Sequence, residues 1–234
     1  MEVIILAGGF GTRLQSVVKD VPKPMADINK KPFLEYLLQY LSKYDITNIV
    51  ISVGYKQDVI KAYFKSEYKG IPLSYSCEDE PLGTGGAIKK ALSLITDNAK
   101  NVLVINGDTF FEVDLAELEK TNNKFEADIT ISLKEMRNFD RYGAVKVESG
   151  IVKKFEEKKF YHKAYINGGV YMIKKSIFDK LPTLSKFSFE EFLENNLSNM
   201  KVCSYVSNNS YFIDIGIPSD YEKAKTDFQN KPFF

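Results

Sequence analysis

The chain has 234 residues and a formal net charge of +1, because 32 Lys and Arg residues are offset by 31 Asp and Glu residues, and 44% of its residues are hydrophobic. That length allows one sizeable core, so we expect a single domain over residues 1–234. The near-neutral charge excludes a nucleic-acid partner held by clustered basic residues. The sequence shows neither the layout of a signal peptide nor an apolar run of membrane-spanning length. We therefore expect a cytoplasmic protein with no membrane partner.

Cysteine and histidine are scarce in this chain. The two cysteines, Cys77 and Cys203, are far apart and lack the spacing of metal ligands, so we interpret them as reduced, partly buried side chains. The single histidine, His162, argues against a Ser-His-Asp triad, a Cys-His pair and a histidine-rich zinc site. Catalysis would therefore rely on carboxylates, lysines and backbone groups, and a metal would be held by oxygen ligands.

In the first half of the chain, strand-like and helix-like stretches alternate, which predicts a parallel sheet covered by helices. The expected strands are Val3–Ala7, Ile49–Val53, Leu73–Ser76 and Val102–Ile105. The expected helices are Phe33–Tyr44, Gln57–Phe64 and Gly85–Ile95.

The second half has strand-like stretches joined by turns or irregular segments, and two further helices. We expect strands at Asp128–Leu133, Tyr142–Val147, Gly169–Ile173 and Val202–Val206, and helices around Phe189–Leu197 and at Ile217–Phe228. No linker rich in Pro, Gly or Ser divides the two halves, so a mixed extension of the same sheet is favoured over a separate domain. We expect residues 230–234 to be a loosely held end.

A glycine-rich loop follows the first expected strand, and residues 5–14 read ILAGGFGTRL. Its glycines free the backbone to turn tightly and to bring N–H groups against a phosphate. The loop lacks the third glycine of a dinucleotide fingerprint and the Gly-Lys-Ser/Thr of a P-loop. It carries its own cation instead, Arg13, whose guanidinium can bind phosphate in bidentate fashion, and Lys23 supplies a second positive charge.

This loop, together with the Pro-Lys-Pro sequence at residues 22–24, resembles the signature of the sugar-1-phosphate nucleotidylyltransferases. The resemblance implies an α/β fold of the Rossmann-like, GT-A type, with a mixed and mostly parallel sheet flanked by helices. It implies that Arg13 and Lys23 are catalytic. The residues that it implies for nucleotide binding in this loop are Leu6, Ala7, Gly8, Gly9, Gly11 and Thr12.

Two carboxylates are candidates for a metal site. Asp108 directly follows the apolar strand Val102–Ile105, at the strand end where open α/β sheets bind ligands, and Asp214 follows a second short apolar run. Together with triphosphate oxygens they could form an oxygen-rich Mg²⁺ site. The resemblance implies that both are metal ligands and that Asp108 is catalytic. On local sequence alone, Asp108 could instead be a turn residue that accepts backbone N–H groups.

A second glycine-containing loop, EPLGTGGA at residues 80–87, resembles the loop with which the family contacts the nucleobase. The resemblance places Gly83 and Thr84 at the edge of the base, although Thr84 could instead cap the following helix. Glu78 or Glu80 could read guanine, because a carboxylate accepts both of its adjacent donors, N1–H and the exocyclic amine. The alternative is that both glutamates are solvated and that backbone groups alone read the base.

A third set of residues resembles the motifs with which the family holds the sugar phosphate. In that resemblance, Lys158 neutralises the phosphate, Glu157 and Asn167 bind hydroxyl groups, and the step Tyr142-Gly143 lies beneath the sugar. Lys159 stands where family members usually carry Pro. It could therefore share the role of Lys158 or displace that side chain slightly.

The sequence therefore predicts an enzyme that uses a nucleoside triphosphate, a sugar 1-phosphate and Mg²⁺, and that can be a homo-oligomer. Its opening loop and short length are similar to those of guanylyltransferases for D-glycero-α-D-manno-heptose 1-phosphate, which implies GTP and a role in capsule or lipopolysaccharide synthesis. A uridylyl- or other nucleotidylyltransferase acting on a hexose or amino-sugar 1-phosphate is the alternative. A sensing paralogue without catalysis would be expected to have lost Arg13, Lys23 or a metal carboxylate. A GT-A glycosyltransferase should show Asp-x-Asp, whereas residues 106–108 read NGD.

Overall fold

The computed structural model describes residues 1–179 and 184–230. The helices are α1 (Phe33–Leu41), α2 (Gln57–Phe64), α3 (Gly83–Ala91), α4 (Leu115–Phe125), α5 (Phe189–Asn196) and α6 (Pro218–Asn230). The strands are β1 (Glu2–Leu6), β2 (Asp27–Ile28), β3 (Lys31–Pro32), β4 (Asn48–Val53), β5 (Glu67–Tyr68), β6 (Ile71–Cys77), β7 (Asn101–Asn106), β8 (Thr109–Phe111), β9 (Ile129–Phe139), β10 (Ala144–Glu148), β11 (Ile151–Glu156), β12 (Tyr161–Lys174), β13 (Val202–Val206) and β14 (Phe212–Asp214).

Within the described ranges, one ten-stranded sheet runs through both halves of the chain, in the order β10-β11-β13-β9-β12-β7-β1-β4-β6-β5. The neighbours β7, β1, β4 and β6 are parallel, as expected for the first half. The long strand β12 pairs antiparallel with both β7 and β9 and so joins the second half to this parallel core. The predicted α/β fold with a mixed extension of the sheet is confirmed.

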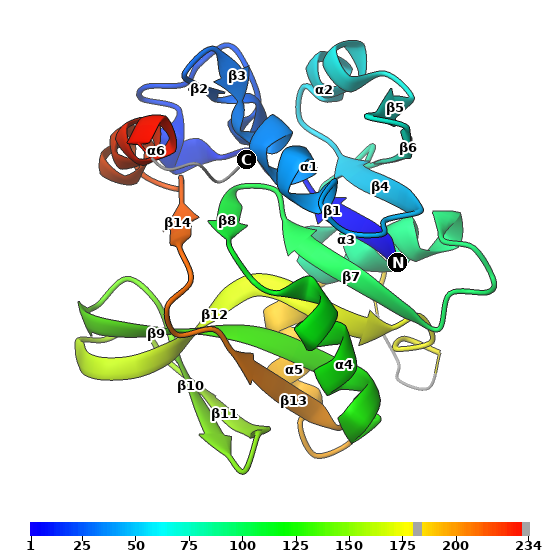
Figure 1. The fold of residues 1–234 in the computed structure, drawn as a ribbon, viewed down its shortest axis with the longest axis vertical. Helices are drawn as coiled ribbons and strands as arrows, with labels where there is room; N and C mark the ends of the chain where they lie inside the picture. Colours follow the sequence, from blue (N-terminus) through cyan, green and yellow to red (C-terminus); the bar gives the residue numbers. More distant parts are fainter. Residues whose placement is uncertain (180–183, 231–234) are drawn as a thin grey trace.

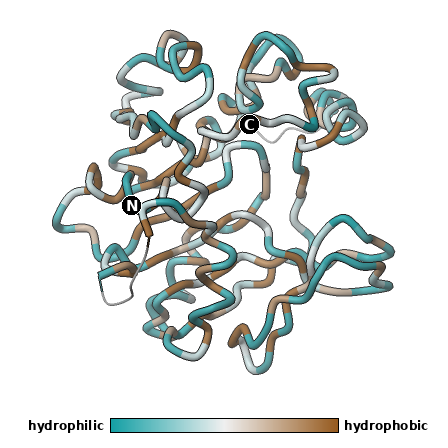
Figure 2. Tube along the Cα trace, turned by 180° about the vertical axis from the view of Figure 1, so that it is seen from behind, coloured by the Kyte–Doolittle hydropathy of each residue, from teal (hydrophilic) through white to brown (hydrophobic). Residues whose placement is uncertain are grey.

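Helices cover both faces of this sheet, which explains why its central strands read as unbroken apolar runs. In β1, Val3 and Ile5 pack into the core beneath α1, α4 and α6, whereas Ile4 packs into the core beneath α3 and α5. Figure 1 shows α4 in front of the sheet and α5 behind it. Figure 2 shows hydrophobic residues concentrated along the strands in the middle of the molecule. A strand buried on both faces needs no polar alternation.

Several elements differ from the expectation. Helix α4 lies outside every predicted element. It begins after Asp114, whose carboxylate accepts hydrogen bonds from the N–H groups of Ala116 and Glu117. Strand β11 also lies outside the predicted elements. Strands β9 and β12 extend well beyond the predicted stretches because they pair with each other along most of their length. Strand β10 begins at Ala144, so the Tyr142-Gly143 step lies in the turn before it. The expected loose end falls largely outside the described residues.

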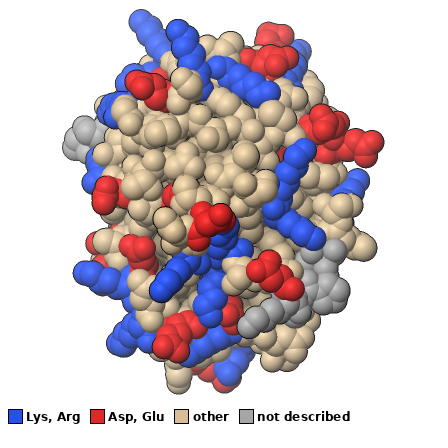
Figure 3. Space-filling view, turned by 90° about the vertical axis from the view of Figure 1, so that its right-hand side faces the viewer, with Lys and Arg blue, Asp and Glu red and all other residues tan. Residues whose placement is uncertain are grey.

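The surface agrees with the composition. On the face shown in Figure 3, Lys and Arg side chains lie interspersed with Asp and Glu side chains. In the part of the chain that the structure describes, no helix is long and apolar enough to cross a membrane. Both cysteines are free; Cys77 is half-buried, as the sequence predicts, whereas Cys203 is fully buried.

Candidate active site

The glycine-rich loop after β1 makes close approaches at Gly8 and Gly11. Gly11 has a φ of +60°, and a Cβ there would lie 2.8 Å from the Cβ of Lys23. At Gly8, an added Cβ would lie 2.4 Å from Oε1 of Glu78. The loop then enters a short 3-10 turn, Thr12–Leu14, anchored by the buried side chain of Leu14. Because the loop is fixed in this way, Arg13 leaves it at a defined position.

Lys23 lies between the two predicted metal carboxylates. Its Nζ atom is 2.6 Å from Oδ2 of Asp108 and 3.4 Å from Oδ1 of Asp214, and its side chain is only 9% exposed. The N–H of Gly216 donates a 2.7 Å hydrogen bond to Oδ1 of Asp214 and fixes that carboxylate further. Burial, followed by the negative charge of Asp108, raises the pKa of Asp214. The structure therefore brings residues from three distant parts of the sequence to one cation-binding point.

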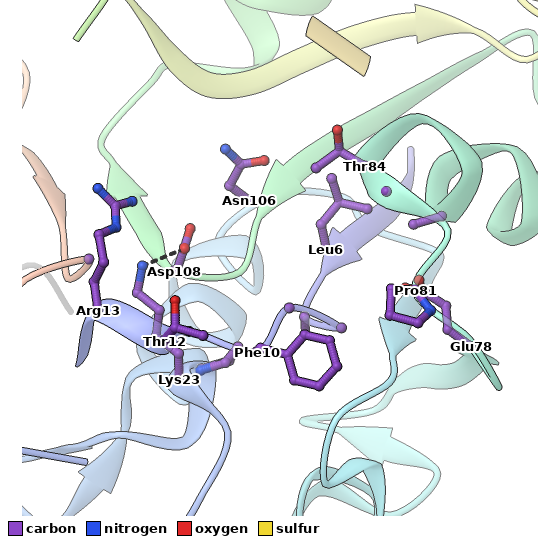
Figure 4. Close-up of a pocket in the computed structure, with 18 residues that line it drawn as sticks. Leu6, Phe10, Thr12, Arg13, Lys23, Glu78, Pro81, Thr84, Asn106 and Asp108 are labelled. Carbon is purple, nitrogen blue, oxygen red and sulfur yellow. Dashed lines mark hydrogen bonds and ion pairs between the residues drawn. The ribbon is translucent and has the colours of Figure 1, made fainter. Parts of the chain in front are cut away.

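A cavity of about 410 Å³ opens over this point (Figure 4). Arg13, Lys23 and Asp108 lie at one end of it, and Glu78 and Pro81 lie at the other. With the exception of Glu80, all the residues that the sequence assigns to the nucleotide line this cavity: Leu6, Ala7, Gly8, Gly9, Gly11, Thr12, Glu78, Gly83 and Thr84.

The structure separates the alternatives for the base-contact loop, residues 80–87, and for the two glutamates beside it. Glu80 is exposed and lines neither this cavity nor the one described below, whereas Glu78 is half-buried. Thr84 does not cap α3, because it lies inside the helix after Leu82, and its Oγ1 atom accepts a 2.9 Å hydrogen bond from the N–H of Phe189. Thr84 thus ties the start of α3 to the start of α5.

A second cavity, of about 480 Å³, lies against the antiparallel part of the sheet. It shares Arg13 and Asn106 with the first cavity, and Asp214 lines it while Asp108 lines the first. The two cavities therefore meet at the cation-binding point. The five residues that the sequence assigns to the sugar phosphate all line the second cavity: Tyr142, Gly143, Glu157, Lys158 and Asn167.

Local contacts explain the positions of these residues. Gly143 has no room for a side chain, because a Cβ there would lie 2.5 Å from the carbonyl oxygen of Glu156. The amide of Asn167 donates a 2.7 Å hydrogen bond to the hydroxyl of Tyr171 and accepts a 3.0 Å hydrogen bond from the N–H of Gly169. Lys158 lines the cavity, whereas the ammonium of Lys159 lies 5.3 Å from the ring centroid of Tyr161.

The sequence-based prediction lacks four charged residues that line the second cavity: Arg141, Glu156, Glu190 and Glu194. Arg141 donates a 2.6 Å hydrogen bond to Asp220, near the start of α6. Glu190 and Glu194 are four residues apart, so they project from the same side of α5. The i, i+4 spacing is the only local sequence pattern that these two glutamates share. It is common on the exposed side of helices and therefore does not indicate a binding site.

The donor set suits a divalent cation that prefers oxygen. Asp108 and Asp214 converge on the single positive charge of Lys23, which shows that a cation is accommodated between them. Among the described residues, no group of three or more His, Cys, Asp or Glu could hold a metal by itself. A metal here would therefore take two protein carboxylates and complete its shell with water or phosphate oxygens, as Mg²⁺ commonly does.

Comparison with known proteins gives long matches. The chain is 50% identical over 222 residues, 94% of it and 97% of the relative, to the D-glycero-alpha-D-manno-heptose 1-phosphate guanylyltransferase of Campylobacter jejuni subsp. jejuni. It is 49% identical over 231 residues, 98% of it and 99% of the relative, to the protein of that name from Aneurinibacillus thermoaerophilus. The solved structure of HddC from Yersinia pseudotuberculosis complexed with GMP-PN is 40% identical, with a TM-score of 0.85 over 97% of this chain and 99% of that one.

The family described as Nucleotidyl transferase matches residues 2–231. This match spans the glycine-rich loop, both carboxylates and both cavities. The match agrees with the observed fold. The pair of adjoining cavities suits a reaction between two substrates. The chain therefore belongs to the nucleotidyl transferase family.

Proposed function

We propose that this protein transfers GMP from GTP to D-glycero-α-D-manno-heptose 1-phosphate. The products would be pyrophosphate and a nucleotide-activated heptose for surface polysaccharide synthesis, made in the cytoplasm where GTP is available. Two relatives that match nearly the whole chain, at 50% and 49% identity, carry the name of this activity. The solved relative complexed with GMP-PN supports a guanine nucleotide as the ligand of the first cavity.

The observation that carries the proposal is the junction of the two cavities. Arg13 lines both cavities, and the carboxylates of Asp108 and Asp214 line one each. A nucleotide with its base beside Glu78 has its phosphates beside Arg13 and Lys23, because these residues mark opposite ends of the first cavity (Figure 4). A sugar phosphate held by Lys158 then approaches the α-phosphate from the second cavity.

The reaction needs positioning and charge neutralisation rather than a side-chain nucleophile. An oxygen of the sugar phosphate is already anionic at neutral pH, and it attacks the α-phosphorus in line as the bond to the pyrophosphate oxygen breaks. Arg13 lies at the junction and neutralises charge that develops on the transferred phosphoryl group. The ammonium of Lys23 is within reach of the same phosphoryl group. No proton transfer to the protein is required.

We assign Mg²⁺ to Asp108 and Asp214. When bound, the metal would neutralise phosphate oxygens and fix the triphosphate for in-line attack. Lys23 occupies the position between the two carboxylates, and its ammonium would move toward the phosphates when the divalent cation replaces it. Its four-carbon stem gives the ammonium several ångströms of reach.

A substrate matrix tests the function. Pyrophosphate release would be measured for GTP, UTP, CTP, dTTP and ATP against heptose and hexose 1-phosphates. We expect the highest kcat/KM for GTP with the heptose 1-phosphate. Preference for UTP, or for a hexose 1-phosphate, would favour the alternative transferases. Tight nucleotide binding without pyrophosphate release from any pair would favour a sensing paralogue.

A further inference from the structure

Two buried serines lie side by side on adjacent strands near Glu78, and only one of them donates a hydrogen bond to it. Ser52 in β4 and Ser76 in β6 are register partners on parallel strands, and they are 0% and 3% exposed. The hydroxyl of Ser52 donates a 3.0 Å hydrogen bond to Oε1 of Glu78. Among the described residues, Oγ of Ser76 has no hydrogen-bond partner. The fully buried Ser52 hydroxyl is therefore committed to the carboxylate at the base end of the nucleotide cavity.

Glu78 is held at both carboxylate oxygens. While Oε1 accepts from Ser52, Oε2 accepts a 3.0 Å hydrogen bond from the N–H of Leu82. On the remaining side, Gly8 approaches so closely that an added Cβ would lie 2.4 Å from Oε1. These contacts orient the plane of the carboxylate between the glycine-rich loop and the base-contact loop. The same side chain lines the nucleotide cavity and an adjoining cavity of about 380 Å³.

Two donors facing the two oxygens favour an ionised carboxylate over an amide. The N–H of Leu82 is a fixed donor, so a Gln at position 78 would have to turn its oxygen toward Leu82 and its NH₂ toward Ser52. A Gln would then have one acceptor oxygen, whereas a carboxylate has two. An ionised carboxylate has about four acceptor positions, and Ser52 and Leu82 take one on each oxygen. The remaining positions can accept N1–H and the exocyclic amine of guanine as a charge-assisted pair. Uracil offers one N–H between two carbonyl groups, which a carboxylate repels.

We propose that Ser52 is a positioning residue that selects guanine by orienting the Glu78 carboxylate. This role rests on the proposed use of GTP. Ser52 does not touch the nucleotide; it acts through Glu78. Removal of its hydroxyl frees Oε1, and the carboxylate can then rotate away from the guanine donors. GTP binding weakens as a result, whereas UTP binding does not.

The test compares the affinities for GTP and UTP, measured by calorimetry without a sugar phosphate, in Ser52→Ala and in its matched control Ser76→Ala. We expect Ser52→Ala to lower the GTP/UTP affinity ratio about tenfold, because a hydrogen bond to a charged group is lost. Ser76→Ala removes an equally buried hydroxyl from the neighbouring strand, and we expect the ratio to stay within about twofold of the wild type. In a Glu78→Gln background, Ser52→Ala should change the ratio much less, since the two residues act as a pair.

The outcomes separate this role from the proposed function. An unchanged ratio in Ser52→Ala, in a wild type that prefers GTP, overturns the role of Ser52 and leaves the guanylyl transfer intact. Equal loss of affinity for both nucleotides shows a merely structural effect and also overturns it. A wild type that binds UTP as tightly as GTP overturns the guanylyl assignment, and the role of Ser52 with it. Measurement without sugar phosphate keeps all these outcomes independent of the sugar.

Discussion

The first cavity, which we propose as the nucleotide cavity, and the second, which we propose as the sugar cavity, are built by different means. The first is shaped by backbone and by short, fixed contacts: Gly11 has a φ of +60° beside Lys23, Gly8 lies against the carboxylate of Glu78, and Lys23 is only 9% exposed. The second presents exposed side chains, since Glu157 and Lys158 are both exposed where they line it. Long solvated side chains adjust to their ligand, whereas close backbone packing does not. We infer that the nucleotide cavity fixes the chemistry and that the sugar cavity adapts to the acceptor.

The same contrast explains which residues the sequence revealed. A loop that contacts its ligand through the backbone needs Gly at fixed spacing and short side chains beside it. The sequence ILAGGFGTRL at residues 5–14 can therefore be recognised as a motif. Arg141, Glu190 and Glu194 reach the sugar cavity from a turn and a helix that are distant in sequence, and charged residues at such places are common on any surface. The positions of Glu190 and Glu194 depend on the packing of α5 against α3, and that of Arg141 depends on its ion pair with Asp220 of α6. No local pattern encodes either contact.

The fold, like the site, could be predicted from the sequence only where a local pattern encodes it. The parallel strands are buried on both faces, so their apolar runs stand out. In α4, the signal was present but weak: Asp114 caps the helix and Glu117 follows at the third position, yet the buried residues include the polar Asn122, which interrupts the apolar period. Asn122 is explained only by its tertiary contact, a 3.0 Å hydrogen bond to the hydroxyl of Thr130.

If the junction serves both cavities, loss of either metal carboxylate should give the largest effect. We expect Asp108→Asn and Asp214→Asn each to lower kcat by about 10³-fold or more, because each removes a charged ligand from a site with only two. Thermal unfolding should show that both variants remain folded. The control is Asp97→Asn, because Asp97 is exposed and lines neither cavity. Near-normal turnover in both variants, or in the wild type with EDTA, would break the metal assignment.

The two cations at the junction should come next. Arg13→Ala and Lys23→Met should lower kcat by about 10²–10³-fold with smaller changes in KM, because both act on charge that grows in the transition state. Lys23→Met should also bind Mn²⁺ more tightly without nucleotide, because the ammonium no longer competes for Asp108 and Asp214. Electron paramagnetic resonance of free Mn²⁺ measures this directly. Weaker Mn²⁺ binding in Lys23→Met would show that the lysine does not occupy the metal position.

Substitution of the base-reading carboxylate should alter selectivity rather than chemistry. We expect Glu78→Gln to lower the ratio of kcat/KM for GTP to that for UTP by about 10²-fold, since a site built to pair with two donors rejects a base that lacks them. Glu80→Gln is the matched control, because Glu80 is exposed and lines neither cavity. A larger effect at Glu80 than at Glu78 would mean that the loop closes differently around the nucleotide. Unchanged ratios in both variants would leave base reading to backbone groups.

The smallest effect should come from the adaptable cavity, and neighbouring lysines make the contrast sharp. Lys158 lines the sugar cavity, whereas Lys159 lies over the ring of Tyr161, 5.3 Å from its centroid. We expect Lys158→Ala to raise the KM for the sugar 1-phosphate about tenfold with little change in kcat, because an exposed cation contributes ground-state binding. Lys159→Ala should leave this KM within about twofold.

Steady-state kinetics at saturating nucleotide separate the two lysines. The two variants lose the same charge at adjacent positions. A difference in their KM for the sugar 1-phosphate therefore reports where each side chain points, not a general electrostatic attraction. Equal effects in both variants would show that the phosphate is held by the local positive field and not by a placed side chain. A fall in kcat for Lys158→Ala comparable with that for Arg13→Ala would go further. It would place Lys158 on the transferred phosphoryl group, so that the sugar cavity as well as the nucleotide cavity would stabilise the transition state.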